Sequence, residues 1–172
     1  MLIVPDRWER ILERDLRVSL EIYLLEFLKL RRWFAGKARV VHSVYILEFV
    51  PIHDRSSGAA LLFIRVDYVG GASDMYTLPL TAAFGEQAAQ IQQDLPGAIV
   101  ATLKVQAKDS EQIGVLYDAL WNPDLSRTLL SAIGSGCRFT GEMGALIASP
   151  TEAYEDLISG GVSLDPAVLK AE

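Results

Sequence analysis

The stretch VVHSVYILEFVPI, residues 40–52, decides the fold of this chain. It is a run of β-branched, aromatic and aliphatic residues, and this composition predicts a long β-strand. Turn-forming residues occupy positions 54–58, and a second β-forming run follows at positions 60–69, so that the two runs predict a β-hairpin. A third, short strand is predicted over residues 75–80. Pro79 indicates an edge or a strand end there, because it has no amide hydrogen to donate.

Helical patterns precede the hairpin. Apolar residues at helical spacing predict helices over residues 6–16 and 21–30, with faces formed by Trp8, Ile11, Leu12 and Leu16 in the first and by Leu20, Leu24, Phe27 and Leu28 in the second. Residues 18–24 also alternate like a strand, but their content of Leu and Glu favours a helix. An N-terminal helix packed on an antiparallel meander is an α+β arrangement.

The second half of the chain again mixes helices and strands. Residues 84–94 predict a linking helix or an exposed loop, and a boundary near residue 90 divides the chain into residues 1–90 and 91–172. Strands are expected over residues 98–105 and 113–117, with one more within residues 137–147. Asn122 and Pro123 predict the start of a helix that Gly134 or Gly136 ends, and a short helix is expected after Thr151.

Composition excludes several classes of protein. The 172 residues are 51% hydrophobic, which excludes a disordered chain, and the net charge of −6 argues against binding to nucleic acid or to an anionic membrane. No run reaches the roughly 20 apolar residues that span a bilayer. Cys137 is the only cysteine, so an intrachain disulfide and a thiolate metal cluster are excluded. The first residues do not resemble a signal sequence, and we expect a cytoplasmic protein.

The densest cluster of cations and aromatics is RRWFAGKAR, residues 31–39. In one interpretation Trp33 and Phe34 anchor a helix end in the core, and the cations are solvated. In the other, the turn contacts a ligand or another domain, because cations donate to oxygen atoms and an indole offers a flat apolar face. The residues of this second interpretation are Arg32, Trp33, Lys37 and Arg39. In this second interpretation Gly36 is expected to let the backbone turn with a positive φ.

No constellation of residues predicts an active site. The glycines of Gly134-Ser135-Gly136 follow a predicted helix, so they indicate its C-terminal cap and not a phosphate-binding loop. Other candidates lack the partners that acid–base, nucleophilic or metal chemistry needs; they are His42, His53, Glu9, Glu13 and Cys137. The sequence therefore predicts no catalytic, cofactor-binding or metal-binding residue.

The order of these motifs resembles the N-terminal cap region of bacterial maltokinases, enzymes that are also found fused to trehalose synthase. The resemblance rests on an N-terminal helix, a turn of the form Arg32-Trp33-Phe34-x-Gly36-Lys37-x-Arg39, a strand pair, and a strand that reads Tyr76-x-Leu78-Pro79-Leu80. It implies a cystatin-like cap, a helix packed on an antiparallel sheet, over residues 1–90. Residues 91–172 would then begin a second small α+β subdomain of a kinase-like N-lobe.

The resemblance also carries expectations about chemistry. It implies that the full-length protein uses ATP and magnesium to phosphorylate maltose to maltose 1-phosphate. The family's nucleotide loop, phosphate-contacting lysine, catalytic aspartate and magnesium-binding acid follow the cap, and residues 168–172 resemble the approach to that loop. The expected role is non-catalytic, regulatory or architectural, and the expected partners are the C-terminal kinase lobe of the same polypeptide and trehalose synthase. The alternative is a free-standing module that binds a sugar or a phosphate through the turn.

Overall fold

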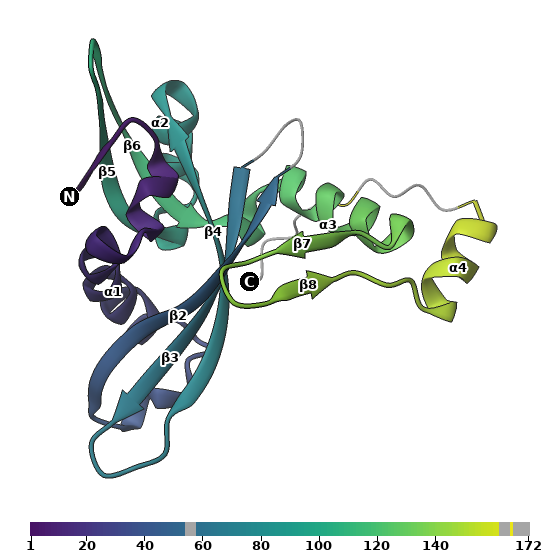
Figure 1. Cartoon of the computed structure of the whole chain (residues 1–172), viewed down its shortest axis with the longest axis horizontal. Helices are drawn as coiled ribbons and strands as arrows, with labels where there is room; N and C mark the ends of the chain where they lie inside the picture. Colours follow the sequence, from purple (N-terminus) through teal and green to yellow (C-terminus); the bar gives the residue numbers. More distant parts are fainter. Residues whose placement is uncertain (54–57, 162–165, 167–172) are drawn as a thin grey trace.

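A computed structural model describes the chain except for residues 54–57, 162–165 and 167–172, where the expected turn and the C-terminal stretch lie. As predicted, the fold is α+β. The main sheet is six-stranded with the strand order β1-β5-β6-β4-β3-β2, in which β1 is parallel to β5 and all other neighbours are antiparallel. Figure 1 shows the curl of this sheet, with β2, β3, β4, β5 and β6 labelled. The strands are β1 (Leu2–Pro5), β2 (Val41–His53), β3 (Gly58–Tyr68), β4 (Asp74–Phe84), β5 (Ile99–Ala107) and β6 (Ser110–Asp118).

Helices cover both faces of this sheet. The α-helices are α1 (Arg14–Lys29), α2 (Gly85–Asp94), α3 (Pro123–Ser135) and α4 (Glu152–Ser159), and the 3₁₀ helices are η1 (Trp8–Leu12), η2 (Ala35–Ala38), η3 (Pro96–Ala98) and η4 (Ala119–Trp121). The largest core lies between α1, η1 and one face of the sheet. The apolar face predicted for the second helix is confirmed, because Leu20, Leu24, Phe27 and Leu28 are all buried in this core.

The N-terminal prediction is wrong in its elements although right in its buried residues. Trp8, Ile11 and Leu12 are buried, but they belong to the 3₁₀ helix η1 and not to an α-helix over residues 6–16. Glu13 then adopts an extended conformation (φ −70°, ψ 148°), and α1 begins at Arg14 as one 16-residue helix. Strand β1 was not predicted, because four residues are too few for a periodic pattern and the partner strand lies about a hundred positions away.

Pro79 does not end its strand. Strand β4 continues to Phe84, and Pro79 pairs with Leu61 of β3. Pairing of β4 with β6 begins only at Leu80, the next residue. Pro79 therefore stands at the last position where β4 pairs with β3 alone. A strand with one free edge is a place in a sheet where a missing amide hydrogen costs little.

The sheet continues across the predicted boundary near residue 90. Strand β4 precedes that boundary and β6 follows it, and the two are neighbours from Leu80 to Phe84. The linking helix predicted over residues 84–94 is α2, which packs Ala88 and Ile91 on the face of the sheet opposite α1. Residues 1–90 and the strands that follow them thus share one sheet.

Two side chains of α1 form hydrogen bonds with the backbone in the middle of edge strand β2. Its pairing with β3 shifts between Ile46 and Glu48, which makes Leu47 a β-bulge. At the bulge the amide of Ile46 donates to the carboxylate of Glu21 (2.8 Å), and the carbonyl of Ile46 accepts from the buried guanidinium of Arg17 (3.3 Å). These bonds use backbone groups that would otherwise be free to pair with a further strand.

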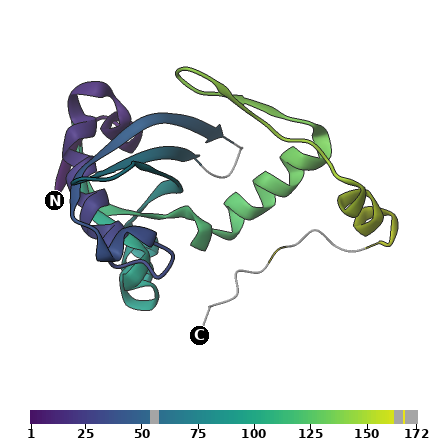
Figure 2. The same ribbon diagram turned by 90° about the horizontal axis from the view of Figure 1, so that it is seen from below.

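Residues 122–159 form an arm that leaves the sheet and returns to it. Asn122 caps α3 as predicted, with its Oδ1 accepting from the amide of Asp124 (3.0 Å), and Gly136 ends the helix with a φ of 63°. Instead of one strand, residues 137–147 contain two, β7 (Arg138–Thr140) and β8 (Ala145–Ile147), which pair as a hairpin. Figure 2 shows this hairpin running back from the end of α3 toward the sheet.

Two carboxylates fasten the hairpin of the arm to the body. Glu48 of β2 accepts hydrogen bonds from the amides of Met143 (2.8 Å) and Gly144 (3.0 Å) at the hairpin tip. Glu142 in the same tip forms an ion pair with Arg17 (2.8 Å). The arm is therefore joined to edge strand β2 and to helix α1 by charge-assisted bonds.

Candidate functional site

The RRWFAGKAR segment connects α1 to β2 and wraps around the end of the sheet. Helix α1 ends at Lys29, and the segment turns through η2 before β2 begins. The expected positive φ at Gly36 is wrong, because the positive-φ glycines lie elsewhere. Gly36 is instead required for space. A Cβ atom there would lie 2.3 Å from the hydroxyl of Tyr68 and 2.6 Å from the ring of Phe34, distances that no side chain can tolerate.

The two aromatic residues of the turn have different environments. Phe34 is 2% exposed and belongs to the main core, so its predicted role as an anchor is confirmed. Trp33 is 47% exposed. Both rings contact Tyr76 of β4, with centroid distances of 5.2 Å for Phe34 and 5.9 Å for Trp33. Trp33 thus presents a flat apolar face to the surroundings.

Arg39 is bound within the domain. Its guanidinium lies 3.4 Å from the ring centroid of Tyr68, pairs with Asp74 (3.0 Å), and donates to the carbonyl of Ala72. Burial, followed by the hydrogen bond with Tyr76, raises the pKa of Tyr68. Because Ala72 lies in the loop between β3 and β4 and Asp74 is the first residue of β4, Arg39 joins the turn to that loop. The stacking on Tyr68 adds a cation–π contact.

Lys37 and Arg32 are exposed on the turn together with Trp33. Lys37 forms no hydrogen bond or ion pair with any part of the chain that the structure describes. All four members of the predicted contact set are therefore exposed, but the guanidinium of Arg39 is already held by Tyr68, Asp74 and Ala72. A contact of Arg32, Trp33 and Lys37 with a ligand or another domain stays a prediction.

Arg31 has a role that the sequence did not reveal. It stacks 4.3 Å above the ring of Phe27 and donates to the carbonyls of Phe27 (3.2 Å) and Gly97. It thereby ties the end of α1 to η3, two elements more than sixty residues apart. A local sequence pattern cannot predict these hydrogen bonds, because their acceptors are backbone carbonyls, which every residue has.

The joint between β6 and α3 contains a buried carboxylate. Asp118 is 6% exposed, and its Oδ1 accepts from the amide of Leu120 (3.0 Å). Burial raises the pKa of Asp118, although the hydrogen bond from Leu120 and the charge of Arg31 act in the opposite direction. Beside it, burial also raises the pKa of Tyr117, with the charge of Asp124 acting the same way.

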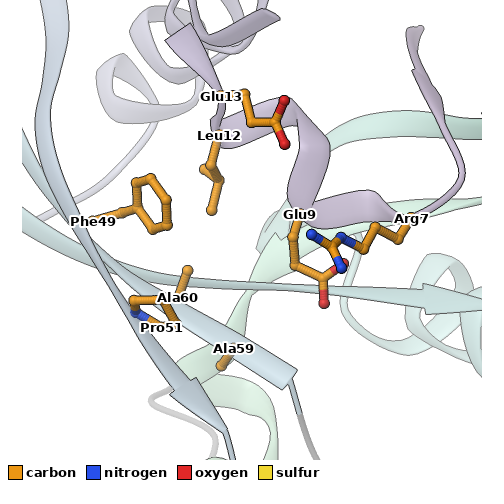
Figure 3. Close-up of a pocket in the computed structure, with 8 residues that line it drawn as sticks. All are labelled: Arg7, Glu9, Leu12, Glu13, Phe49, Pro51, Ala59 and Ala60. Carbon is orange, nitrogen blue, oxygen red and sulfur yellow. The ribbon is translucent and has the colours of Figure 1, made fainter. Parts of the chain in front are cut away.

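A pocket of about 230 Å³ lies between η1 and the neighbouring ends of β2 and β3 (Figure 3). Its floor is apolar, with Leu12 and Phe49 facing each other, and Arg7 and Glu9 lie at its other end. Glu13 also lines it but is paired with Arg10 at 2.9 Å.

The described residues contain no group of three or more His, Cys, Asp or Glu side chains arranged to hold a metal ion. Cys137 is exposed, and its Sγ lies 3.1 Å from the hydroxyl of Ser135. Among the helices that the structure describes, none has the length and apolar character needed to cross a membrane.

Comparison with known proteins assigns the family. Residues 27–121 match the family described as the maltokinase N-terminal cap domain, and this match covers more than half of the chain. The chain belongs to the maltokinase N-terminal cap domain family. No curated protein matches it. The matched region of the cap domain begins in the last turns of α1, contains the whole Arg31–Arg39 turn, and ends with η4.

The turn of the cap domain allows a prediction that separates anchors from exposed contacts. Phe34→Ala should destabilise the protein by roughly 3–5 kcal/mol, since it removes a buried aromatic ring. Trp33→Ala should cost about 0.5–1.5 kcal/mol, the value of an aromatic pair, and Lys37→Ala should stay within about 0.5 kcal/mol. Urea unfolding of the three variants measures these differences. Equal stability of the Phe34 variant and the parent would contradict the anchor role.

Asp118 of the cap domain predicts a pH dependence of stability. Because its pKa is raised in the folded state, the stability associated with this group is fully present below its ordinary pKa and is lost as the pH rises through the raised value. Asp118→Asn keeps an acceptor for Leu120 but removes the charge. The stability of this variant relative to the parent should therefore increase between about pH 4 and pH 7.

Thermal unfolding of the Asp118 variant and the parent across that pH range measures the effect. Asp109→Asn, on the exposed turn between β5 and β6, is the matched control for the loss of one negative charge. The two variants should differ in their pH dependence. If the difference in stability between Asp118→Asn and the parent did not change with pH, the ionised form of Asp118 would not be destabilised by burial, and the prediction would be wrong.

Proposed function

We propose that this cap domain is the non-catalytic N-terminal region of a maltokinase. The observation that carries the proposal is the family match over residues 27–121, which includes the complete turn and five of the six strands of the main sheet. In the full-length protein the reaction is the phosphorylation of maltose to maltose 1-phosphate, with ATP and magnesium held by the kinase part. The role of the cap is architectural or regulatory. The cytoplasm is the proposed compartment.

Exposed apolar side chains support an architectural role. On the arm, the C-terminal helix α4 has no buried residue, and Leu157 and Ile158 are 49% and 45% exposed. Met143 and Ile147 are exposed on or beside the hairpin. Surfaces of this kind commonly pack against another domain. We assign them to the kinase lobe of the same polypeptide, with trehalose synthase as a second candidate partner.

The turn supports an alternative in which the chain is a free-standing module that binds a sugar or a phosphate. Trp33 offers an exposed indole, and Lys37 offers an ammonium group on the same turn. An indole can pack on a sugar ring, and an ammonium group can bind a phosphate. In the maltokinase interpretation the same side chains contact the kinase lobe.

The proposal predicts that the isolated chain neither binds Mg·ATP nor transfers phosphate. Phosphoryl transfer requires groups that hold triphosphate and magnesium, and these are assigned to the kinase part. Isothermal titration calorimetry with ATP and magnesium should give no saturable heat, whereas the full-length protein should bind and phosphorylate maltose. Stoichiometric binding of ATP to the isolated chain at micromolar affinity would contradict a non-catalytic role.

Kinetics of the full-length protein test the contact between the turn and the kinase part. Lys37→Ala should leave the melting temperature unchanged but alter kcat or KM for maltose or ATP, because the side chain is exposed and unpaired within the described chain. Lys108→Ala, on the exposed turn between β5 and β6, is the matched control. Parental kinetics in the Lys37 variant would show that this side chain makes no functional contact.

A further inference from the structure

A second pocket lies at the joint between the family-matched region and the arm. It has a volume of about 380 Å³ and is bounded by α2 on one side and by the start of α3 on the other. Its apolar floor includes Ile91, Leu95 and Tyr117. The volume is within the range of small-molecule sites. The pocket does not include the turn or any residue that the sequence marked as a contact.

The α2 wall of this pocket consists of free polar side chains. Gln87, Gln90 and Asp94 are spaced by three and four residues, which places them on one face of the helix. All three are exposed, and none forms a hydrogen bond or ion pair within the described part of the chain. Two amides and one carboxylate are therefore available to a ligand. An amide both donates and accepts, whereas the carboxylate only accepts.

The opposite wall is aromatic and polar. Trp121 is half-buried and ends η4. Asn122 follows it, and its Oδ1 accepts from the amide of Asp124 (3.0 Å). The indole of Trp121 offers an apolar surface on which a ring can pack.

The chemistry of the lining excludes several ligand classes. The described lining residues include no Lys, Arg or His, and Asp94 is negatively charged, so a phosphate or another anion would be repelled. One carboxylate is too few oxygen ligands for a divalent cation. A purely apolar ligand would leave three polar side chains unpaired when it displaces their water. A neutral polyhydroxyl compound meets each of these conditions.

We propose that the pocket between α2 and η4 binds a neutral di- or oligosaccharide. The hydroxyl groups donate to Asp94 and exchange hydrogen bonds with Gln87 and Gln90, while one sugar ring packs on Trp121. The proposal does not depend on the maltokinase assignment, because it uses only the side chains of the pocket. Since Asn122 both lines the pocket and caps α3, a bound saccharide contacts the first residues of the arm.

Nuclear magnetic resonance of the intact chain tests the proposal. The probes are maltose, trehalose, cellobiose and maltotetraose, and the readout is the indole N–H signal of each tryptophan, assigned with Trp33→Phe and Trp121→Phe variants. At least one probe should shift the Trp121 signal saturably and leave that of Trp33 unchanged. No saturable shift with any probe overturns the proposal. A shift at Trp33 instead of Trp121 also overturns it and favours a sugar site on the turn.

Substitutions on α2 locate the site. Gln90→Ala and Asp94→Asn should each weaken the affinity about tenfold, as expected for the loss of one hydrogen bond to a well-placed polar group. Gln93→Ala is the matched control, because Gln93 is an exposed residue of the same helix that does not line the pocket. Unchanged affinity in both pocket variants, or an equal loss in the control, overturns the assignment of the site to this pocket.

Discussion

The close approach of Gly36 to Tyr68 and Phe34 is the contact on which the matched domain depends. Because position 36 has no Cβ atom, the segment after α1 can lie directly on the end of the sheet. Phe34 then enters the core, and Trp33 contacts Tyr76 while it stays 47% exposed. One missing side chain therefore sets both the path of the chain and the outward direction of the turn.

Cations of the same segment complete the arrangement by binding in opposite directions. Arg31 reaches back to α1 and to η3, and Arg39 reaches forward to the loop between β3 and β4. Both guanidinium groups also lie over aromatic rings, where part of their hydration is replaced. Lys37, a compact ammonium group without such a ring, stays exposed. Geometry therefore distinguishes Arg31 and Arg39, which bind within the domain, from Lys37, which forms no hydrogen bond or ion pair with the described residues.

The arm depends on a second set of charged groups. Arg17 is buried beneath the bulge of β2 and joins the carbonyls of Leu12 and Ile46 to the carboxylate of Glu142. Together with Glu48 it places the hairpin against the edge of the sheet. The same bonds close the middle of that edge to a further strand. One buried guanidinium thus contributes both to the position of the arm and to the protection of β2.

The sequence by itself determined the α+β class, the strands of the hairpin, the apolar face of α1, the N-cap of α3 at Asn122, and its end at one of two glycines, Gly134 or Gly136. These features depend on local periodicity and on the backbone preferences of single residues, which a linear pattern contains. The turn was recognised from its residue types, and its family followed from the same residues. The absence of a predicted active site also came from residue types and spacings alone.

Only the tertiary structure decided the rest. Strand β1 exists because β5 offers it a partner, and Pro79 is tolerated because β6 joins β4 one residue later. Gly36 is required because there is no space for a Cβ atom, and not because of a positive φ. Arg39 forms an ion pair within the domain, whereas Lys37 forms none with the described residues. The pocket between α2 and η4 joins residues from Gln87 to Pro123. Each of these features depends on contacts between residues that are far apart in the sequence. A local sequence pattern does not contain information about such contacts.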